Sequence, residues 1–320
     1  MPDFLKILLE VISITIPIFA VIAIGFLIKR KGVIKDEHVP LLNKLTYNFG
    51  LSALVFINIT KYKLGEIFNL GIIKVIYSTF FITLVVVFLS FYFLKINNKT
   101  KGAVIVSSYR SNMAFVGMPV LLYAYSSLAA AKASVVIAFL MPLNIISAVL
   151  FFKFMDLREQ QNSRKINFWR VILGIISDPV IIAVVIGLII SYFNFKIPDP
   201  VNKIFEILSG IAVPIALISI GASFKFSHIK NNVKYLSFIS MIKLVIMPLI
   251  ALILSIYVFR VEKLDRDIIC ILFGMPLAVA TFIQSEKYSS DSDFISSALI
   301  TTTIASAFTI SAWLFVLKLI

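Results

Sequence analysis

Long apolar segments alternate with short polar connections along the whole chain. Val11–Ile28 and Val75–Leu94, for example, contain no charged residue. Each is long enough to cross about 30 Å of hydrocarbon as an α-helix. The pattern therefore predicts an all-α polytopic membrane protein. Its ten predicted spans are roughly 7–28, 39–60, 70–94, 102–125, 132–155, 171–193, 200–223, 235–259, 268–287 and 293–318.

Composition agrees with this class. Hydrophobic residues make up 60% of the 320 residues and charged residues only 14%, with a mean hydropathy of +1.01. A soluble domain carries about 25% charged residues. No stretch is polar enough to form a soluble domain.

The net charge of +14 is informative because of where the basic residues lie along the chain. Most Lys and Arg residues lie in the short connections, which is the positive-inside pattern of a protein whose partner is the lipid bilayer rather than a nucleic acid. The bias predicts both termini outside the cell (inner) membrane. The longest connection, 156–170, then faces the cytoplasm.

The two halves of the chain resemble each other. Pro17 and Gly25 are eight residues apart in the first span, and Pro179 and Gly187 are eight apart in the sixth. A Gly-Met-Pro tripeptide occurs in the fourth span and again in the ninth. These matches predict an internal duplication. Each copy has five spans, an odd number, so the second must enter the membrane inverted, as in many secondary transporters. The predicted division is 1–155 for the first repeat, 156–170 for the connecting loop and 171–320 for the second repeat.

Both Gly-Met-Pro tripeptides, Gly117–Pro119 and Gly274–Pro276, predict helix breaks. Proline removes one backbone hydrogen bond, and in lipid the freed carbonyl groups need partners. Broken helices at matching depth therefore indicate a binding site, and half-helix N-termini favour an anion. The simpler interpretation is an ordinary proline kink.

Arg110 and Asn112 precede the first tripeptide. Arg110 lies near mid-depth, where a cation is costly unless it is paired or hydrated. It is a candidate for binding an anion, or for holding a neighbouring helix through backbone carbonyls. The Asn112 amide can donate two hydrogen bonds to a carboxylate. On a regular helix the two side chains point about 200° apart, so both face one substrate only if the helix distorts.

Other polar residues within the spans carry two interpretations each. Thr281 and Gln284 are candidate substrate ligands or helix-packing residues. Asp178 and Glu206 are candidates for proton coupling, although Asp178 before Pro179 is also the expected order of a helix N-cap. Lys243 is expected to snorkel toward the interface, or else to pair with a substrate or carboxylate.

The sequence contains no motif of a catalytic site. It lacks a nucleophile elbow, a Walker loop and an Asp-rich phosphate motif. Cys270 is the single cysteine, and neither histidine lies in a predicted span, so no cofactor or metal site is expected. The chain is predicted not to be an enzyme.

The segment Tyr109–Pro119 resembles the auxin efflux carrier family, whose fourth span has an R-x-N…F-x-G-x-P pattern. Weaker likenesses cover the chain from end to end, for example Lys243 before Pro248. Two places depart from the family pattern: Ser52 stands where a proline is usual, and Asp178 where an asparagine is common. The plant PIN auxin carriers are related.

The resemblance implies two inverted five-helix repeats, with spans 1, 2, 6 and 7 forming a scaffold and the other spans a moving transport domain. It further implies that spans 4 and 9 cross at the substrate site, elevator-type motion, and a homodimer. Bacterial members of that family are permeases for malate, malonate or other organic acids.

The sequence thus predicts a secondary active transporter of small carboxylate anions, coupled to protons or sodium if it drives uptake. An alternative is a cation-coupled carrier of larger amphipathic acids, with Asn144, Gln284 and 301–303 as candidate sodium ligands. A third is a membrane sensor without transport. The candidate substrate-binding residues are Arg110, Asn112, Gly117, Pro119, Gly274, Pro276, Thr281 and Gln284.

Overall fold

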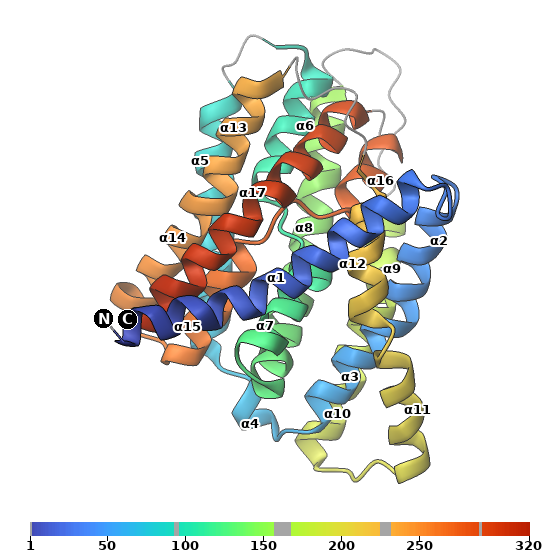
Figure 1. The fold of residues 1–320 in the computed structure, drawn as a ribbon, viewed down its shortest axis with the longest axis vertical. Coiled ribbons are helices and arrows are strands. Elements are labelled where there is room, and N and C mark those ends of the chain that lie inside the picture. The colour runs from blue at the N-terminus through green and yellow to red at the C-terminus, as the bar shows by residue number, and fades with distance from the viewer. Residues whose placement is uncertain (1, 93–95, 157–167, 225–231, 288–289) are drawn as a thin grey trace.

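The structure, a computed structural model, describes residues 2–92, 96–156, 168–224, 232–287 and 290–320. The described part is a bundle of helices without a β-strand (Figure 1). Most of the predicted connection 156–170 lies outside the described residues. The structure therefore does not test its cytoplasmic position.

The helices follow the predicted apolar segments along the chain. Several are interrupted by π-helical turns, labelled η. In chain order they are α1 (Pro2–Arg30), α2 (His38–Leu45), η1 (Thr46–Leu51), α3 (Ser52–Thr60), α4 (Leu64–Ile67), α5 (Leu70–Tyr92), α6 (Asn98–Tyr109), η2 (Met113–Gly117), α7 (Met118–Ala124), α8 (Ser127–Asp156), α9 (Phe168–Ile176), α10 (Pro179–Phe193), α11 (Asp199–Ser209), α12 (Ala212–Ala222), α13 (Val233–Met241), η4 (Ile242–Ile246), α14 (Met247–Ile253), η5 (Leu254–Val258), α15 (Lys263–Phe273), α16 (Ala280–Lys287) and α17 (Ser292–Leu319).

Six described helical segments are long and apolar enough to cross a membrane, and the pair α9 and α10, bent by 52°, makes a seventh. The predicted spans 102–125 and 268–287 are absent from this set because each consists of two short helices. The predicted span 39–60 consists of α2, η1 and α3. The polytopic all-α class is thus confirmed, while the count of ten remains a prediction.

Two helix pairs pack closely through glycine. A Cβ atom at Gly25 of α1 would lie 2.2 Å from the carbonyl oxygen of Ile218 in α12. Gly187 of α10 packs against α3, where its Cβ would lie 3.1 Å from the Ile59 side chain and 3.7 Å from the carbonyl oxygen of Phe56. Gly25 and Gly187 are 162 residues apart, and so are Phe56 and Ile218. The two contacts therefore correspond in position between the halves of the chain.

The Gly-Met-Pro tripeptides do not correspond in this way. The interruption in the predicted fourth span lies at Arg110–Asn112, upstream of Gly117–Pro119, whereas Gly274–Pro276 begins the interruption in the ninth. The expected break at Gly117–Pro119 is therefore wrong. The helix continues because the π-turn η2 bonds the N–H of Met118 to the carbonyl of Met113, which accommodates Pro119 in the first turn of α7.

The broken helices are fastened at their outer ends. The buried ammonium of Lys132 in α8 pairs with the buried carboxylate of Asp265 in α15 at 2.5 Å. At the start of α6, the Thr100 hydroxyl donates to the Asp291 carboxylate, which caps α17, at 2.6 Å. These contacts join α6 to α17 and α15 to α8.

The chain termini lie side by side (Figure 1). Glu10 of α1 forms an ion pair with Lys318 of α17. The rings of Phe4 and Phe315 also meet edge to face, with centroids 4.9 Å apart. Both termini therefore lie at the same end of the bundle.

Candidate functional site

The two interrupted helices meet at their interruptions. Ser111 and Leu277 form an antiparallel bridge. The N–H of Asn112 donates to the carbonyl of Pro276 at 2.7 Å, and the N–H of Ala278 donates to the carbonyl of Arg110 at 3.1 Å. Some of the backbone groups freed by the two breaks therefore satisfy each other, as an apolar surrounding requires.

Helix N-termini meet at this crossover. Asn112 caps the helix Met113–Ala124, since its Oδ1 accepts from the N–H of Phe115 at 3.3 Å. Within the described part of the chain, the N–H groups of Met113 and Ala114 donate to no protein acceptor. The same holds for Val279 and Ala280 at the start of α16. Such free N–H groups and the helix dipole favour an anion.

Arg110 brings a full positive charge to the crossover. It is 6% exposed, and its Nη1 donates to Oε1 of Gln284 in α16 at 2.5 Å. Among the described residues, no carboxylate lies within 4.0 Å of the guanidinium group. A buried guanidinium group with only an amide partner is costly unless an anion joins it. Arg110 therefore has the surroundings of an anion ligand.

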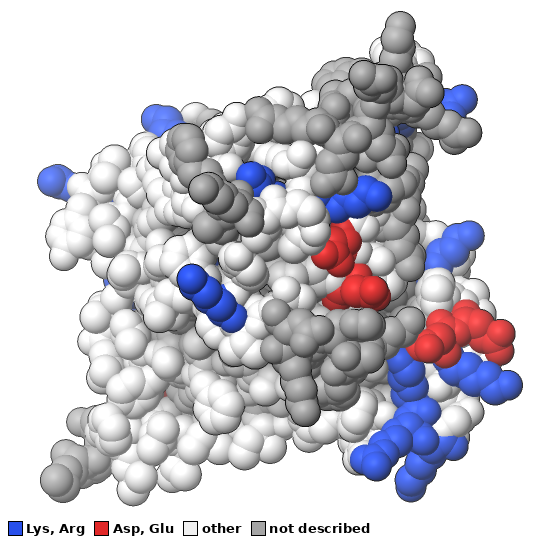
Figure 2. All heavy atoms as spheres, turned by 90° about the horizontal axis from the view of Figure 1, so that it is seen from above, with Lys and Arg blue, Asp and Glu red and all other residues white. Residues whose placement is uncertain are grey.

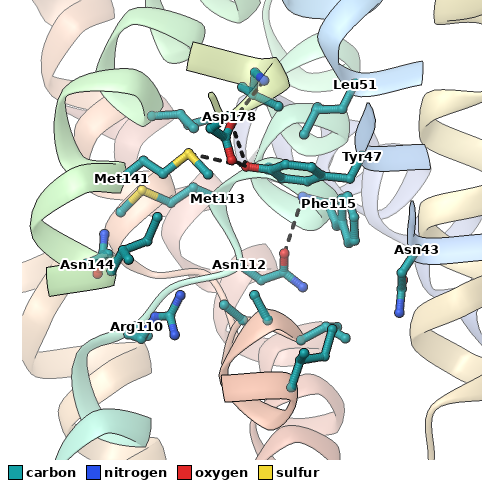
Figure 3. A pocket seen from close by; sticks show the side chains of 18 of the residues that line it. Asn43, Tyr47, Leu51, Arg110, Asn112, Met113, Phe115, Met141, Asn144 and Asp178 are labelled. Carbon is teal, nitrogen blue, oxygen red and sulfur yellow. Dashed lines mark hydrogen bonds between the residues drawn. The ribbon is translucent and has the colours of Figure 1, made fainter. Parts of the chain in front are cut away.

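A cavity of about 390 Å³ lies beside the crossover. Figure 3 shows Arg110 and Asn112 on one side of it and Asp178 and Tyr47 on another. The wall between is mostly apolar, and its exposed residues are Pro40, Lys44, Ala280 and Ile283. The larger apolar lining residues are Leu51, Met113, Phe115, Ile137, Met141, Ile145, Val180, Val279 and Ile283.

The wall opposite the crossover carries one carboxylate. Asp178 accepts from the N–H groups of Val180 and Ile181 at 2.9 and 3.2 Å, so it caps α10 as its place before Pro179 predicts. The Tyr47 hydroxyl donates to the same carboxylate at 3.0 Å and also lies 3.3 Å from the sulfur of Met141 in α8 (Figure 3). The pair thus joins α10 and η1 and touches α8.

The structure brings four of the predicted residues to the cavity: Arg110, Asn112, Gln284 and Asp178. The interruption of the helix resolves the angular conflict between Arg110 and Asn112, because neither residue lies within a regular helical turn. Asn144, a candidate sodium ligand, also lines the cavity, and its buried Oδ1 accepts no hydrogen bond from the described residues.

The other predicted residues lie off the cavity wall. A Cβ at Gly117 would meet the Leu272 side chain at 2.7 Å, and Gly274 packs against Pro248, so the glycines permit close packing. Pro119 is buried within its helix. Pro276 contributes its main-chain carbonyl to the site, where it accepts a hydrogen bond from the N–H of Asn112.

Thr281 and Glu206 also lie off the cavity wall. The Thr281 hydroxyl is buried and has no hydrogen-bond partner among the described residues. Glu206 is exposed on α11, where it accepts from Asn202 at 3.0 Å.

Lys243 does not snorkel to the interface. Its side chain is wholly buried in the π-turn η4, and Nζ donates to Oγ of Ser111 at 3.0 Å. The expectation of snorkelling is therefore wrong. The apolar sequence around Lys243 gives no sign of the inward direction, because its partner Ser111 lies in the interruption of a different span.

Sequence reasoning also missed Tyr47 and Ser111. Tyr47 is one of eleven tyrosines, and nothing local marks it. Ser111 stands between Arg110 and Asn112, and its Oγ donates to the carbonyl of Phe273 at 2.9 Å. Its position between two candidate residues was the only available signal.

An apolar helical bundle with a cavity at the crossing of two broken helices, where a few polar side chains stand in a mostly apolar wall, is typical of membrane transport proteins. The model of the family described as membrane transport protein matches residues 10–314. The chain belongs to this family, the auxin efflux carrier family, which confirms the resemblance drawn from Tyr109–Pro119. A transporter is not an enzyme.

Similar proteins span nearly the same length. An uncharacterized transporter of Methanocaldococcus jannaschii is 22% identical over 94% of this chain and 97% of its own. A putative malonate transporter of Rhizobium meliloti is 21% identical over 97% and 96%, respectively. The uncharacterized transporter YfdV of Escherichia coli is 23% identical over 95% and 97%. All three are prokaryotic and are named as transporters.

Proposed function

We propose that this protein is a secondary carrier of small organic anions, and that the carboxylate binds at the crossover. The observation that carries the proposal is Arg110, a buried cation without a carboxylate partner in the described residues, at the rim of the cavity. Asn112 and the free N–H groups of Met113 and Ala114 add donors on the same wall. An anion bound there would neutralise the positive charge of Arg110.

The mechanism proposed is elevator-type alternating access. The scaffold would consist of α1 to α3 and α9 to α12, and the helices around the crossover would form the moving body. The corresponding glycine contacts at Gly25 and Gly187 support a division into inverted repeats 1–155 and 171–320. The fastening of α6 to α17 and of α15 to α8 supports a body that moves as a unit.

The proposal includes a cell-membrane location with both termini outside, and a homodimer. Figure 2 shows the end at the top of Figure 1, where Lys and Arg side chains gather at one corner, with Asp and Glu side chains beside them. The last turn of α1 carries Lys29 and Arg30. By the positive-inside rule this end faces the cytoplasm. The cavity, whose wall includes the exposed Lys44 of the helix that follows, would then be open to the inside.

The substrate class has two candidates. The relative in Rhizobium meliloti is named as a putative malonate transporter, which supports a small dicarboxylate. The mostly apolar wall and the carboxylate of Asp178 favour instead an acid with one carboxylate and an apolar body, because a second carboxylate would meet Asp178. We further propose that uptake of the anion is coupled either to protons, through Asp178, or to sodium.

Currents from purified protein in liposomes on a solid-supported membrane test these candidates. We would apply malonate, malate and monocarboxylates of increasing apolar size, with and without a pH gradient, to the wild type and to Asn112→Ala. The proposal expects currents for particular acids that vanish in the variant. Binding of an acid without any flux would instead favour a sensor, and currents for cations or neutral solutes alone would reject the anion carrier.

A further inference from the structure

The crossover contains a second buried cation. Lys243 is 0% exposed, and its ammonium group makes its hydrogen bond to Ser111 in the interruption after α6. Among the described residues, no carboxylate lies within ion-pair distance of it. An isolated buried ammonium group is strongly unfavourable, so a lysine that keeps its proton at this place needs compensation from something other than a carboxylate.

Two helix C-termini supply that compensation. α6 ends at Tyr109 and α15 ends at Phe273, and both ends lie at the crossover. The carbonyl groups at a helix C-terminus carry a partial negative charge. Ser111 relays it directly, since its hydroxyl accepts from Lys243 and donates to the last carbonyl of α15 at 2.9 Å.

The local backbone holds Lys243 at this place. Pro248 has no N–H, so the carbonyl of Leu244, four residues earlier, lacks its helical donor. The indole N–H of Trp313 in α17 donates to that carbonyl at 2.8 Å. The π-turn η4 and this side-chain bond together fix the segment that carries Lys243.

Converging carbonyl dipoles inside a broken-helix carrier are the surroundings in which a coupling cation is commonly bound. We propose that the Lys243 ammonium group is a tethered cation, which occupies this place and holds the two broken helices together without a bound metal cation. Arg110 lies on the cavity side, where it binds Gln284, and so has a separate partner. The inference does not depend on which anion is carried.

Thermal unfolding of the purified protein tests the proposal without any substrate. The wild type is expected to melt at the same temperature in choline, sodium and methylammonium chloride. Lys243→Ala is expected to melt several degrees lower in choline chloride, and to recover in a dose-dependent way with methylammonium, a small amine that fits the vacated space. Tetramethylammonium, which is too large and has no N–H donor, is expected to have no effect.

Lys74→Ala is the control, since Lys74 is an exposed lysine of the apolar helix α5. It is expected to show no response to methylammonium. If Lys243→Ala cannot be purified, the melting temperatures of Lys243→Arg and Lys243→Gln test the proposal instead. The charged arginine variant is expected to melt well above the neutral glutamine variant. A Lys243→Ala protein that does not respond to methylammonium, or equal melting of the Arg and Gln variants, would overturn the tethered cation.

Discussion

The guanidinium group of Arg110 donates to the side-chain oxygen of Gln284 at 2.5 Å, and the two residues, 174 positions apart in sequence, meet where the two broken helices cross. The amide orients the cation but does not neutralise it. A neutral partner leaves Arg110 free to attract an anion, whereas a carboxylate partner would have occupied it. The pair therefore connects the architecture of the crossover to the proposed choice of substrate.

Removing this charge is expected to weaken anion binding. Arg110→Met should raise the dissociation constant of a transported acid by about 10- to 100-fold, since a hydrogen bond to a charged group contributes about 1.5–3 kcal/mol. Gln284→Ala should have a smaller effect, because the cation remains. Titration of the acid against intrinsic fluorescence measures both constants. Equal affinity in Arg110→Met and the wild type would exclude direct contact.

Asp178 can be tested for coupling separately from its capping role. Asparagine caps a helix about as well as aspartate, so Asp178→Asn should fold normally. If this carboxylate carries the proton, uptake driven by a pH gradient should be lost in the variant, while exchange of substrate across the membrane persists. Radiolabelled uptake and exchange in liposomes measure the two activities.

Glu206→Gln is the control for Asp178→Asn, because Glu206 is exposed and lies off the cavity wall. It should leave pH-driven uptake unchanged. Uptake that survives in both variants would exclude both carboxylates from coupling.

The contact between α1 and α12 should not tolerate a methyl group. A Cβ at Gly221 would lie 1.8 Å from the carbonyl oxygen of Ile22, which requires the helices to separate. Gly221→Ala should therefore lower the free energy of unfolding by about 1–3 kcal/mol or more. Gly174→Ala in α9 is the control, since nothing lies within 4 Å of its Cβ position. The melting temperatures of the two variants should differ clearly; similar values would contradict the packing.

The buried pair of Lys132 and Asp265 should be sensitive to the loss of one partner. Asp265→Asn leaves an ammonium group buried without its counter-charge, and we expect a loss of about 3–5 kcal/mol in the free energy of unfolding. Replacing both residues, with Lys132→Met and Asp265→Leu, should restore much of it. Lys318→Ala, which breaks a more exposed pair, should cost only about 0–1 kcal/mol. Denaturant titration in detergent compares the three.

Much of the site could be predicted, because its residues are conspicuous in an apolar sequence. A charged or amide side chain within a span needs a reason, and Arg110, Asn112, Gln284 and Asp178 all line the cavity. The failures have a common cause. Pro119 was expected to break its helix, but a π-turn accommodates it. Lys243 was expected to reach the interface, but it donates to Ser111 in the interruption of a different span.

From the sequence alone follow the apolar helices, the polytopic class, the family and most of the polar residues at the cavity, because length, hydropathy and charge are properties of short segments. Only the tertiary structure decides where the helices are interrupted and which residues meet. The N–H of Asn112 donates to the carbonyl of Pro276, and the Tyr47 hydroxyl donates to Asp178, and both pairs are more than 100 residues apart in sequence. Such partners are selected by the need to satisfy buried polar groups in an apolar bundle, and that need is met by the whole fold.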